Sequence, residues 1–280
     1  MKKISRRSFL AAAGLTVAAL ALTACGGSAS TASSAAASSV AASSEAASTS
    51  AAAAELTTVE AGKLTMATNA AFPPYEMTTD AGAFEGIDIE TAQAIADKLG
   101  LELQIDDMDF DAALLSVQQG KADIVMAGVT VTDERKAVMD FSDSYATGIQ
   151  SIIVPEGSDI ASPDDLAGKK IGTQRGTTGY IYCSDDFGDD AVVAYDNGLT
   201  AVQALNNGQV DAVVIDNAPA KEFVAANPGL VILDTSYAEE DYAIGLAKGS
   251  ALEDAVNAAL EELKADGTLQ SIVDKYITAE

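Results

Sequence analysis

The chain is predicted to fold as an α/β protein with two similar lobes, each a mostly parallel sheet flanked by helices. Short apolar runs that are typical of strands alternate with segments of helical periodicity from about residue 63 to residue 276. The alternation restarts after Tyr145, and a pattern of helix end, glycine, aspartate and buried strand occurs at residues 116–126 and again at 204–214. This echo indicates two units built alike, although chance convergence in two helix–glycine–strand units would give the same pattern.

The elements of the first half follow from local patterns. Residues 63–68 alternate in polarity and predict a strand, and the two prolines within residues 69–75 predict a loop. Residues 87–99 carry apolar side chains at helical spacing, and Gly100 ends this helix. Also expected are a strand at 101–105, a helix from Asp109 or Phe110 to about Gly120, and a strand at 124–126.

The second half continues the alternation. Pro163 suits the first position of a capped helical turn at residues 162–166. We expect strands at 150–154, 170–173, 191–195, 212–215 and 242–247, and helices at 199–206, 217–226, 252–264 and 269–276. Ligands of α/β proteins bind beyond the carboxyl ends of the strands. The residues after the strands at 124–126 and 212–215 are therefore the first candidates for a site.

Composition excludes several kinds of site. The chain has no histidine, which rules out Ser-His and Cys-His catalytic pairs and histidine-ligated metals. The net charge is −26, and it becomes −30 once the four cations and no acids of residues 1–24 are removed. Such a charge argues against nucleic acid and against docking on anionic lipid by charge. We expect no metal and no cofactor.

Residues 1–24 are predicted to be a lipoprotein signal peptide. A basic start precedes an apolar segment too short to span a bilayer comfortably, and Leu22-Thr23-Ala24-Cys25 resembles a bacterial lipobox. Cys25 would then be acylated and become the first mature residue, so we do not expect it to pair with Cys183. Residues 5–10 also resemble a twin-arginine motif, which leaves both export routes open. Residues 25–55, almost all Ala and Ser after the cysteine, predict a disordered tether.

Arg135 follows the strand at 124–126, in the first turn of a short helix that Thr132 or Asp133 can cap. A guanidinium beside backbone N–H groups suits one small carboxylate, whereas a surface arginine paired with a nearby acid is the plainer alternative. Asp216 ends the second repeated strand. A cation on one wall of a cleft and a carboxylate on the other fit the zwitterionic head group of an amino acid.

Aromatic residues offer walls for the rest of such a ligand. Phe72 and Phe110 could enclose a ligand side chain, and Tyr75 fits better in the core. Residues 176–178 could add donors to the carboxylate, but they lack the spacing of a phosphate-binding loop.

Seven motifs give a family resemblance: residues 67–76, 86–90, 108–110, 127–135, 141–143, 174–178 and 265–268. From Leu64 to about Tyr276 they resemble the polar-amino-acid solute-binding proteins of ABC importers, which have the two-lobed type II periplasmic-binding-protein fold. The resemblance implies a first lobe at 60–144 and 242–280, a second lobe at 150–237, and two hinge strands between them. It implies capture of a free amino acid by hinge closure, delivery to a permease, and no enzymatic activity.

The resemblance also implies nine ligand-binding residues. The ligand carboxylate would be held by Arg135 and the backbones of Thr130 and Thr178, and the ammonium by Asp216, the Gly128 carbonyl and the Thr130 hydroxyl. The ligand side chain would lie between Phe72 and Phe110. Its tip would face Asn69 and Gln174. Because Asn69 and Gln174 are uncharged where basic-amino-acid or glutamine binders often carry Asp or Lys, neutral polar ligands rank first. Basic ligands rank second and acidic ones last, because Glu76 lies nearby in the sequence and the net charge without residues 1–24 is −30. Cystine-like ligands stay open.

The resemblance further implies an extracytoplasmic monomer held at the cell membrane through Cys25. Two alternatives remain: a lipoprotein that senses its ligand for a receptor, and a dehydratase-like enzyme on the same fold.

Overall fold

The computed structural model describes residues 56–277. The predicted signal peptide, Cys25 and the tether lie outside these residues. The helices are α1 (Ile87–Leu99), α2 (Phe110–Gln118), α3 (Asp133–Lys136), α4 (Thr178–Phe187), α5 (Gly198–Asn206), α6 (Asn217–Ala226), α7 (Glu253–Ala265) and α8 (Thr268–Tyr276), with 3₁₀ turns η1 (Pro163–Leu166) and η2 (Asp189–Ala191). None of these described helices is long and apolar enough to cross a membrane.

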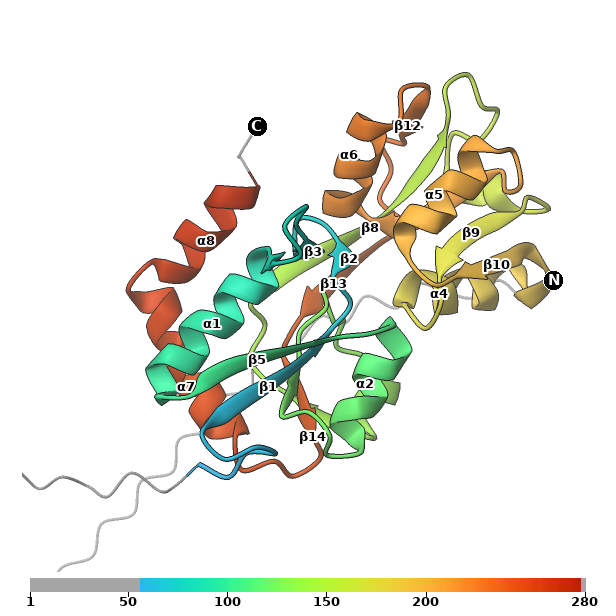
Figure 1. The fold of residues 1–280 in the computed structure, drawn as a ribbon. Coiled ribbons are helices and arrows are strands. Elements are labelled where there is room, and N and C mark those ends of the chain that lie inside the picture. The colour runs from blue at the N-terminus through green and yellow to red at the C-terminus, as the bar shows by residue number, and fades with distance from the viewer. Residues whose placement is uncertain (1–55, 278–280) are drawn as a thin grey trace, which may run out of the picture. The chain divides into compact units, whose positions relative to one another are not determined.

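The strands form three sheets (Figure 1). They are β1 (Lys63–Thr68), β2 (Ala71–Phe72), β3 (Glu76–Thr78), β4 (Phe84–Glu85), β5 (Glu102–Asp107), β6 (Ile124–Val125), β7 (Met139–Phe141), β8 (Ala146–Pro155), β9 (Ile171–Gln174), β10 (Val192–Tyr195), β11 (Ala212–Asp216), β12 (Leu230–Ile232), β13 (Ala238–Tyr242) and β14 (Gly245–Ala247). The predicted α/β class is confirmed.

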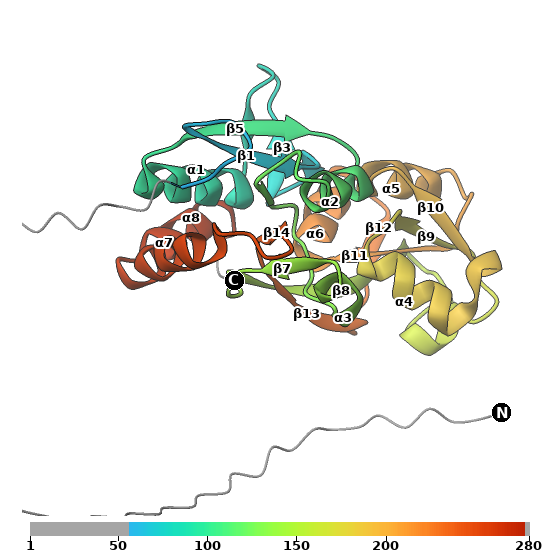
Figure 2. The same cartoon turned by 90° about the horizontal axis from the view of Figure 1, so that it is seen from below.

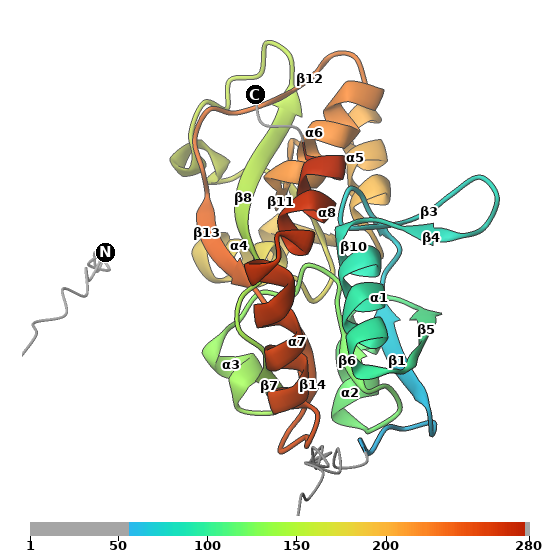
Figure 3. The ribbon, with the colours of Figure 1, turned by 90° about the vertical axis from the view of Figure 1, so that its left-hand side faces the viewer.

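The first sheet has the order β5-β1-β6-β14-β7, and β14 runs antiparallel to both its neighbours while β1 is parallel to β5 and β6. Successive side chains of β1 point to opposite faces. Leu64 and Met66 pack in the cluster that α1, α7 and α8 cover, and Ala67 packs in the cluster of α2. Figure 3 shows α1, α7 and α8 on the same side of this sheet.

The second sheet has the order β10-β9-β11-β8-β12, with β13 also paired to β8. Strands β9, β10 and β11 are parallel, and β8 runs antiparallel to β11, β12 and β13. Val213 and Ile215 of β11 pack with α5 and α6, and Val214 packs in the cluster of Cys183 on α4. Figure 2 shows α4 and α5 beside strands β9 to β11.

The chain passes between the two sheets twice. It enters the second sheet through β8, directly after β7, and returns through β13 to β14. These two strands pair antiparallel from Ala146 opposite Tyr242 to Gln150 opposite Ala238. The prediction of a single strand at 242–247 is therefore wrong. Tyr242 ends β13 in the second sheet, residues 243 and 244 connect the two sheets, and β14 begins at Gly245 in the first.

Helix α4 is the main element that the sequence patterns missed. Its sequence, TGYIYCSDDF, has few strong helix formers and ends in two aspartates and a phenylalanine. Capping and burial hold it: the Thr177 hydroxyl accepts a hydrogen bond from the Tyr180 N–H at 3.3 Å, and Cys183 is fully buried. The predicted loop at 69–75 also contains β2, so that part of the loop was wrong.

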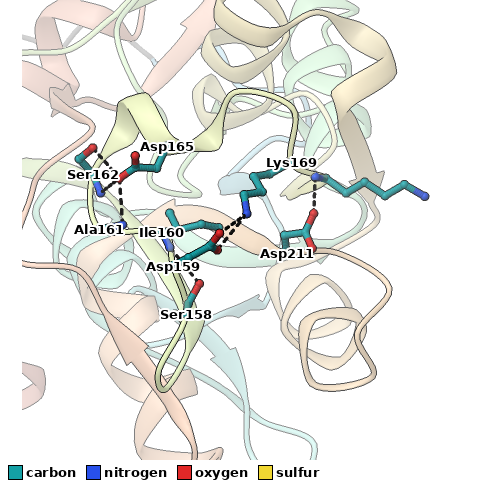
Figure 4. Close-up of polar contacts among 9 residues, drawn as sticks. Ser158, Asp159, Ile160, Ala161, Ser162, Asp165, Lys169 and Asp211 are labelled. Atoms are coloured by element: carbon teal, nitrogen blue, oxygen red, sulfur yellow. Dashed lines mark hydrogen bonds and ion pairs between the residues drawn. The ribbon is translucent and has the colours of Figure 1, made fainter.

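The turn at η1 is held by polar contacts at the surface of the second sheet (Figure 4). Asp165 accepts hydrogen bonds from the backbone N–H and the hydroxyl of Ser162, at 3.0 and 2.9 Å. Lys169 forms an ion pair with Asp159 at 2.9 Å, in which the Lys169 side chain is 29% exposed and the Asp159 side chain 81% exposed. Exposed pairs of this kind stabilise a fold only slightly, so the turn depends on its cap and on the buried Leu166.

The backbone conformation at position 86, between β4 and α1, requires a glycine. Gly86 has φ of 130°, and a Cβ there would overlap the carbonyl of Tyr75 and stand 2.9 Å from the nitrogen of Glu76. We expect Gly86→Ala to lower the free energy of unfolding by about 3 kcal/mol, measured by urea denaturation. Gly82→Ala is the matched control, because Gly82 also has positive φ but has open space around it, and we expect a loss of about 1 kcal/mol. Equal losses would contradict the steric argument.

Candidate functional site

A cavity lies where loops from the two large sheets meet, with an empty space of about 450 Å³ that includes solvent at its mouth. The structure brings all nine predicted ligand-binding residues to its wall. The lining residues are Asn69, Phe72, Glu76, Phe110, Ala127, Gly128, Thr130, Arg135, Gln150, Gln174, Thr177, Thr178, Val214, Ile215, Asp216 and Tyr242. Their shared location supports one site, and the role of each stays a prediction.

Backbone groups from both large lobes of the fold hold the Arg135 side chain in place. The hydroxyl of Thr132 caps its short helix by accepting a hydrogen bond from the Arg135 N–H at 3.2 Å. The guanidinium donates to the carbonyls of Thr130 at 2.7 Å and Gly176 at 3.1 Å, and it lies 5.4 Å from the ring centre of Phe110. Burial lowers the pKa of Arg135, and the nearby charge of Glu240 opposes that shift.

Arg135 is 8% exposed and forms no ion pair with an acid among the described residues. The plainer alternative of a surface arginine paired with a nearby aspartate is therefore wrong. The guanidinium contacts two carbonyls and an aromatic ring, and the charge of Glu240 acts on it without a direct ion pair. The Arg135 side chain can therefore bind an anion in the cavity.

Asp216 ends β11 and caps α6. One carboxylate oxygen accepts a hydrogen bond from the Ala218 N–H at 2.9 Å, and the other accepts from the Ile149 N–H at 2.8 Å and the Tyr242 hydroxyl at 3.0 Å. Burial raises the pKa of Asp216 to about 6, although all three hydrogen bonds act to lower it. A cation beside this carboxylate would favour its ionised form.

Two further contacts join the sheets across the cavity. The Gln174 amide donates to the Asn69 side-chain oxygen at 2.9 Å, and Asn69 in turn donates to the Met108 carbonyl at 2.9 Å. The hydroxyls of Thr130 and Thr178 are 3.4 Å apart. Together with the bond from Arg135 to Gly176, these contacts join the segments of the two large sheets directly at the cavity.

Gly128 allows two aromatic rings to approach the site closely. It has φ of 54°, and a Cβ there would stand 2.9 Å from Phe72 and 3.2 Å from Tyr242. Phe72 stacks on Tyr75 with ring centres 5.7 Å apart, and Tyr75 meets Tyr242 edge-on at 5.5 Å. Tyr75 is buried in the core and does not line the cavity, in agreement with the expectation for it.

Sequence reasoning missed the acids that border the cavity besides Asp216. Glu76 lines it, is fully buried, and has no well-aligned hydrogen-bond donor on either carboxylate oxygen, although the Asp88 side chain interacts with it. Burial raises the pKa of Glu76 well above its ordinary value, and the charges of Asp88 and Asp107 raise it further. Glu240 accepts hydrogen bonds from the Thr130 hydroxyl and the Gln150 amide, both at 3.0 Å.

From the sequence, Glu76 was weighed only as a nearby acid in the ranking of ligands, and it was not among the expected ligand-binding residues. The other lining residues that were missed are Ala127, Gln150, Val214, Ile215 and Tyr242, whereas Thr177 belongs to the segment 176–178 that was expected to add donors. The described lining residues contain no cysteine, histidine or lysine, and no described group of acids or cysteines could hold a metal ion. The site therefore offers fixed charges and aromatic walls.

Residues 64–279 match the family model of bacterial extracellular solute-binding proteins, family 3. The chain belongs to this family. The L-cystine-binding protein TcyJ of Escherichia coli K12 is 33% identical over 226 residues, which cover 79% of this chain and 85% of that protein.

Solved structures of the same fold resemble the chain. The arginine-, lysine-, histidine-binding protein ArtJ of Geobacillus stearothermophilus is 34% identical, with a TM-score of 0.75 over 78% of this chain and 96% of that chain. An ancestral arginine-binding protein bound to glutamine is 42% identical, with a TM-score of 0.74 over 78% of this chain and 99% of that chain. Members of the family thus share the fold and differ in the amino acid named for them.

Proposed function

We propose that the protein captures a free amino acid outside the cytoplasm and delivers it to an ABC importer. The observation that carries this proposal is a buried cation and a buried anion on the wall of one cavity, Arg135 and Asp216. A free amino acid presents a carboxylate and an ammonium in a fixed relation, so it compensates both charges at once. Relatives named as cystine-binding and arginine-binding proteins of the family support the same class of ligand.

For the side chain, we propose a basic amino acid ahead of the neutral polar ones that the sequence ranks first. Glu76 is a second acid on the cavity wall, and neither of its carboxylate oxygens has a well-aligned donor among the described residues. A buried acceptor without a donor is costly, and a cationic side chain would supply both the donor and the charge. The name of ArtJ supports this order, whereas the glutamine-bound ancestral protein supports a neutral ligand held through Asn69 and Gln174.

Capture would proceed by closure of two lobes at 60–144 with 242–280 and at 150–237. Strands β8 and β13 are the two connections at which such a hinge could bend. A ligand that touches both lobes binds the closed form better and shifts the population towards it. Contacts such as Gln174 to Asn69, which join the sheets directly, belong to the closed form.

We expect the domain to act as a monomer without enzymatic activity, because its buried charges, Arg135 and Asp216, suit a zwitterion that is bound and released unchanged. A lipid on Cys25 would keep it at the membrane near its permease. Palmitate labelling of the expressed chain, lost in Cys25→Ser, tests the anchor.

A thermal-shift screen of the mature protein against the twenty amino acids and cystine tests the ligand class. We expect arginine, lysine or histidine to raise the melting temperature most. Glu76→Gln should move the preference towards glutamine, because it removes the acid and leaves a neutral amide. Glu85→Gln, at an exposed acid of the neighbouring β4, is the control and should keep the wild-type order. A wild-type preference for neutral ligands that Glu76→Gln leaves unchanged would refute the basic assignment.

A further inference from the structure

Two buried carboxyl groups, those of Glu76 and Asp88, interact with each other beside the cavity. Glu76 starts β3 and Asp88 lies in the first turn of α1, and both side chains are 0% exposed. One Asp88 oxygen accepts a hydrogen bond from the Gly128 N–H at 2.9 Å, whereas its other oxygen and both oxygens of Glu76 have no well-aligned partner. Glu76 is the member of the pair that reaches the cavity.

The groups that act on this pair are acids and phenols. Burial is the largest cause that raises the pKa of both carboxyls, and it raises that of Asp88 to about 6. Asp107 adds a negative charge near Glu76, and Tyr145 interacts with Asp88. Tyr75 is affected by the charges of both acids. No cation is among the largest causes that act on either carboxyl.

Two adjacent carboxylates cannot both stay ionised in such surroundings, because each charge would be buried without a counter-charge. One proton on the pair removes this conflict, and it allows one carboxyl to donate to the other. The pair then titrates as a unit. A cation that reached Glu76 from the cavity would remove the same conflict in another way.

We propose that the Glu76–Asp88 pair holds one proton in the unliganded protein and releases it when a cationic side chain occupies the cavity. The inference rests on the proposed function, since it takes the ligand to be an amino acid. On binding, the carboxyl O–H bond breaks, the proton passes to solvent, and the ligand cation takes its place as counter-charge. A neutral side chain leaves the proton where it is.

The affinity for a basic ligand should rise with pH. At a pH below the pKa of the pair the proton must be removed before the ligand cation can take its place, so the affinity rises by up to about tenfold per pH unit. Arg135, Asp216, Glu240 and Tyr242 also lie at or beside the cavity, and Asp216 changes its own protonation when an ammonium arrives. These four groups face the head group that all amino acids share. A comparison of two ligands with the same head group removes their contribution.

Calorimetric titrations with L-arginine and L-citrulline test the inference, because citrulline has nearly the shape of arginine and no side-chain charge. Each titration is run at pH 7 in phosphate and in Tris, whose ionisation enthalpies differ, so the heats give the number of protons released. We expect arginine to release about one proton more than citrulline. The affinity for arginine should rise between pH 6 and pH 8 relative to that for citrulline.

Two variants assign the proton to the pair. Glu76→Gln keeps the shape of a protonated glutamate and should abolish the difference between the two ligands. Asp88→Asn keeps an acceptor for the Gly128 N–H, removes the repulsion, and should shift the pH profile for arginine to lower pH. Asp88 would thus be a positioning residue for the charge on Glu76.

The outcomes separate this inference from the proposed function. Arginine that binds with the same proton release as citrulline, or a difference that persists in Glu76→Gln, overturns the inference and leaves amino-acid capture intact. Binding of citrulline without binding of arginine overturns the inference together with the basic ligand class. Absence of binding by every amino acid overturns the proposed function itself.

Discussion

Arg135→Ala is expected to weaken amino-acid binding by roughly 30-fold to a few thousand-fold, as measured by calorimetric titration. Truncating one partner of a buried, hydrogen-bonded charge pair costs about 2–5 kcal/mol, and about 1.4 kcal/mol corresponds to a factor of ten. The guanidinium is held by two carbonyls and a ring, so its position is set before the ligand arrives. Arg135→Lys should recover only part of the affinity, because an ammonium cannot reproduce the planar fork.

The molecule supplies a matched control for this variant. Arg175 follows β9, has a side chain 53% exposed, and stands 3.9 Å from Asp196. Arg175→Ala removes the same charge from the chain, so it should leave affinity within about twofold of wild type. Similar losses in the two variants would mean that total charge, and not a contact at Arg135, governs binding. Thermal unfolding checks that Arg135→Ala still folds after it loses its bonds to Thr130 and Gly176.

Asp216→Ala is expected to reduce affinity by a similar factor and also to destabilise the domain. The carboxylate would hold the ligand ammonium, and it also accepts hydrogen bonds from Ile149, Ala218 and Tyr242. Unpaired buried donors cost about 1–3 kcal/mol each, so urea denaturation should show a clear loss of stability. Titration with the preferred amino acid measures the loss of binding in the same sample.

A second variant separates these two effects. Asp216→Asn removes the charge and keeps one oxygen acceptor, so it should recover part of the stability without recovering the affinity. Asp196→Ala, at an acid whose side chain is 74% exposed, is the control for net charge and should change neither quantity. Wild-type affinity in Asp216→Asn would contradict the role of this carboxylate as the ammonium site.

Elements with strong local signals could be predicted from the sequence. The bounds of α1 and α6 agree with prediction, because Gly100 ends the first at a positive φ and Asp216 caps the second. Local sequence patterns did not predict the elements whose structure depends on tertiary contacts. Helix α4 depends on the Thr177 cap and a buried Cys183, and β13, with its sequence AEEDY, becomes a strand because it pairs with β8.

Some residues of the candidate site could likewise be predicted from the sequence, and others could not. The nine residues carried over from the family resemblance all reach one cavity, since that resemblance contains information about tertiary structure. Glu76 and Tyr242 were missed because a sequence does not show which face of β3 or β13 turns inward. Their significance depends on neighbours far along the chain: Asp88 lies near Glu76, and Asp216 accepts from the Tyr242 hydroxyl.

A crystal structure of the mature domain grown with the amino acid that stabilises it most is the most direct test of the central claim. We predict the α-carboxylate within hydrogen-bond distance of the Arg135 guanidinium, and the α-ammonium within hydrogen-bond distance of the Asp216 carboxylate. A basic side chain should extend towards Glu76. A ligand bound elsewhere, with no contact to either Arg135 or Asp216, would contradict the account.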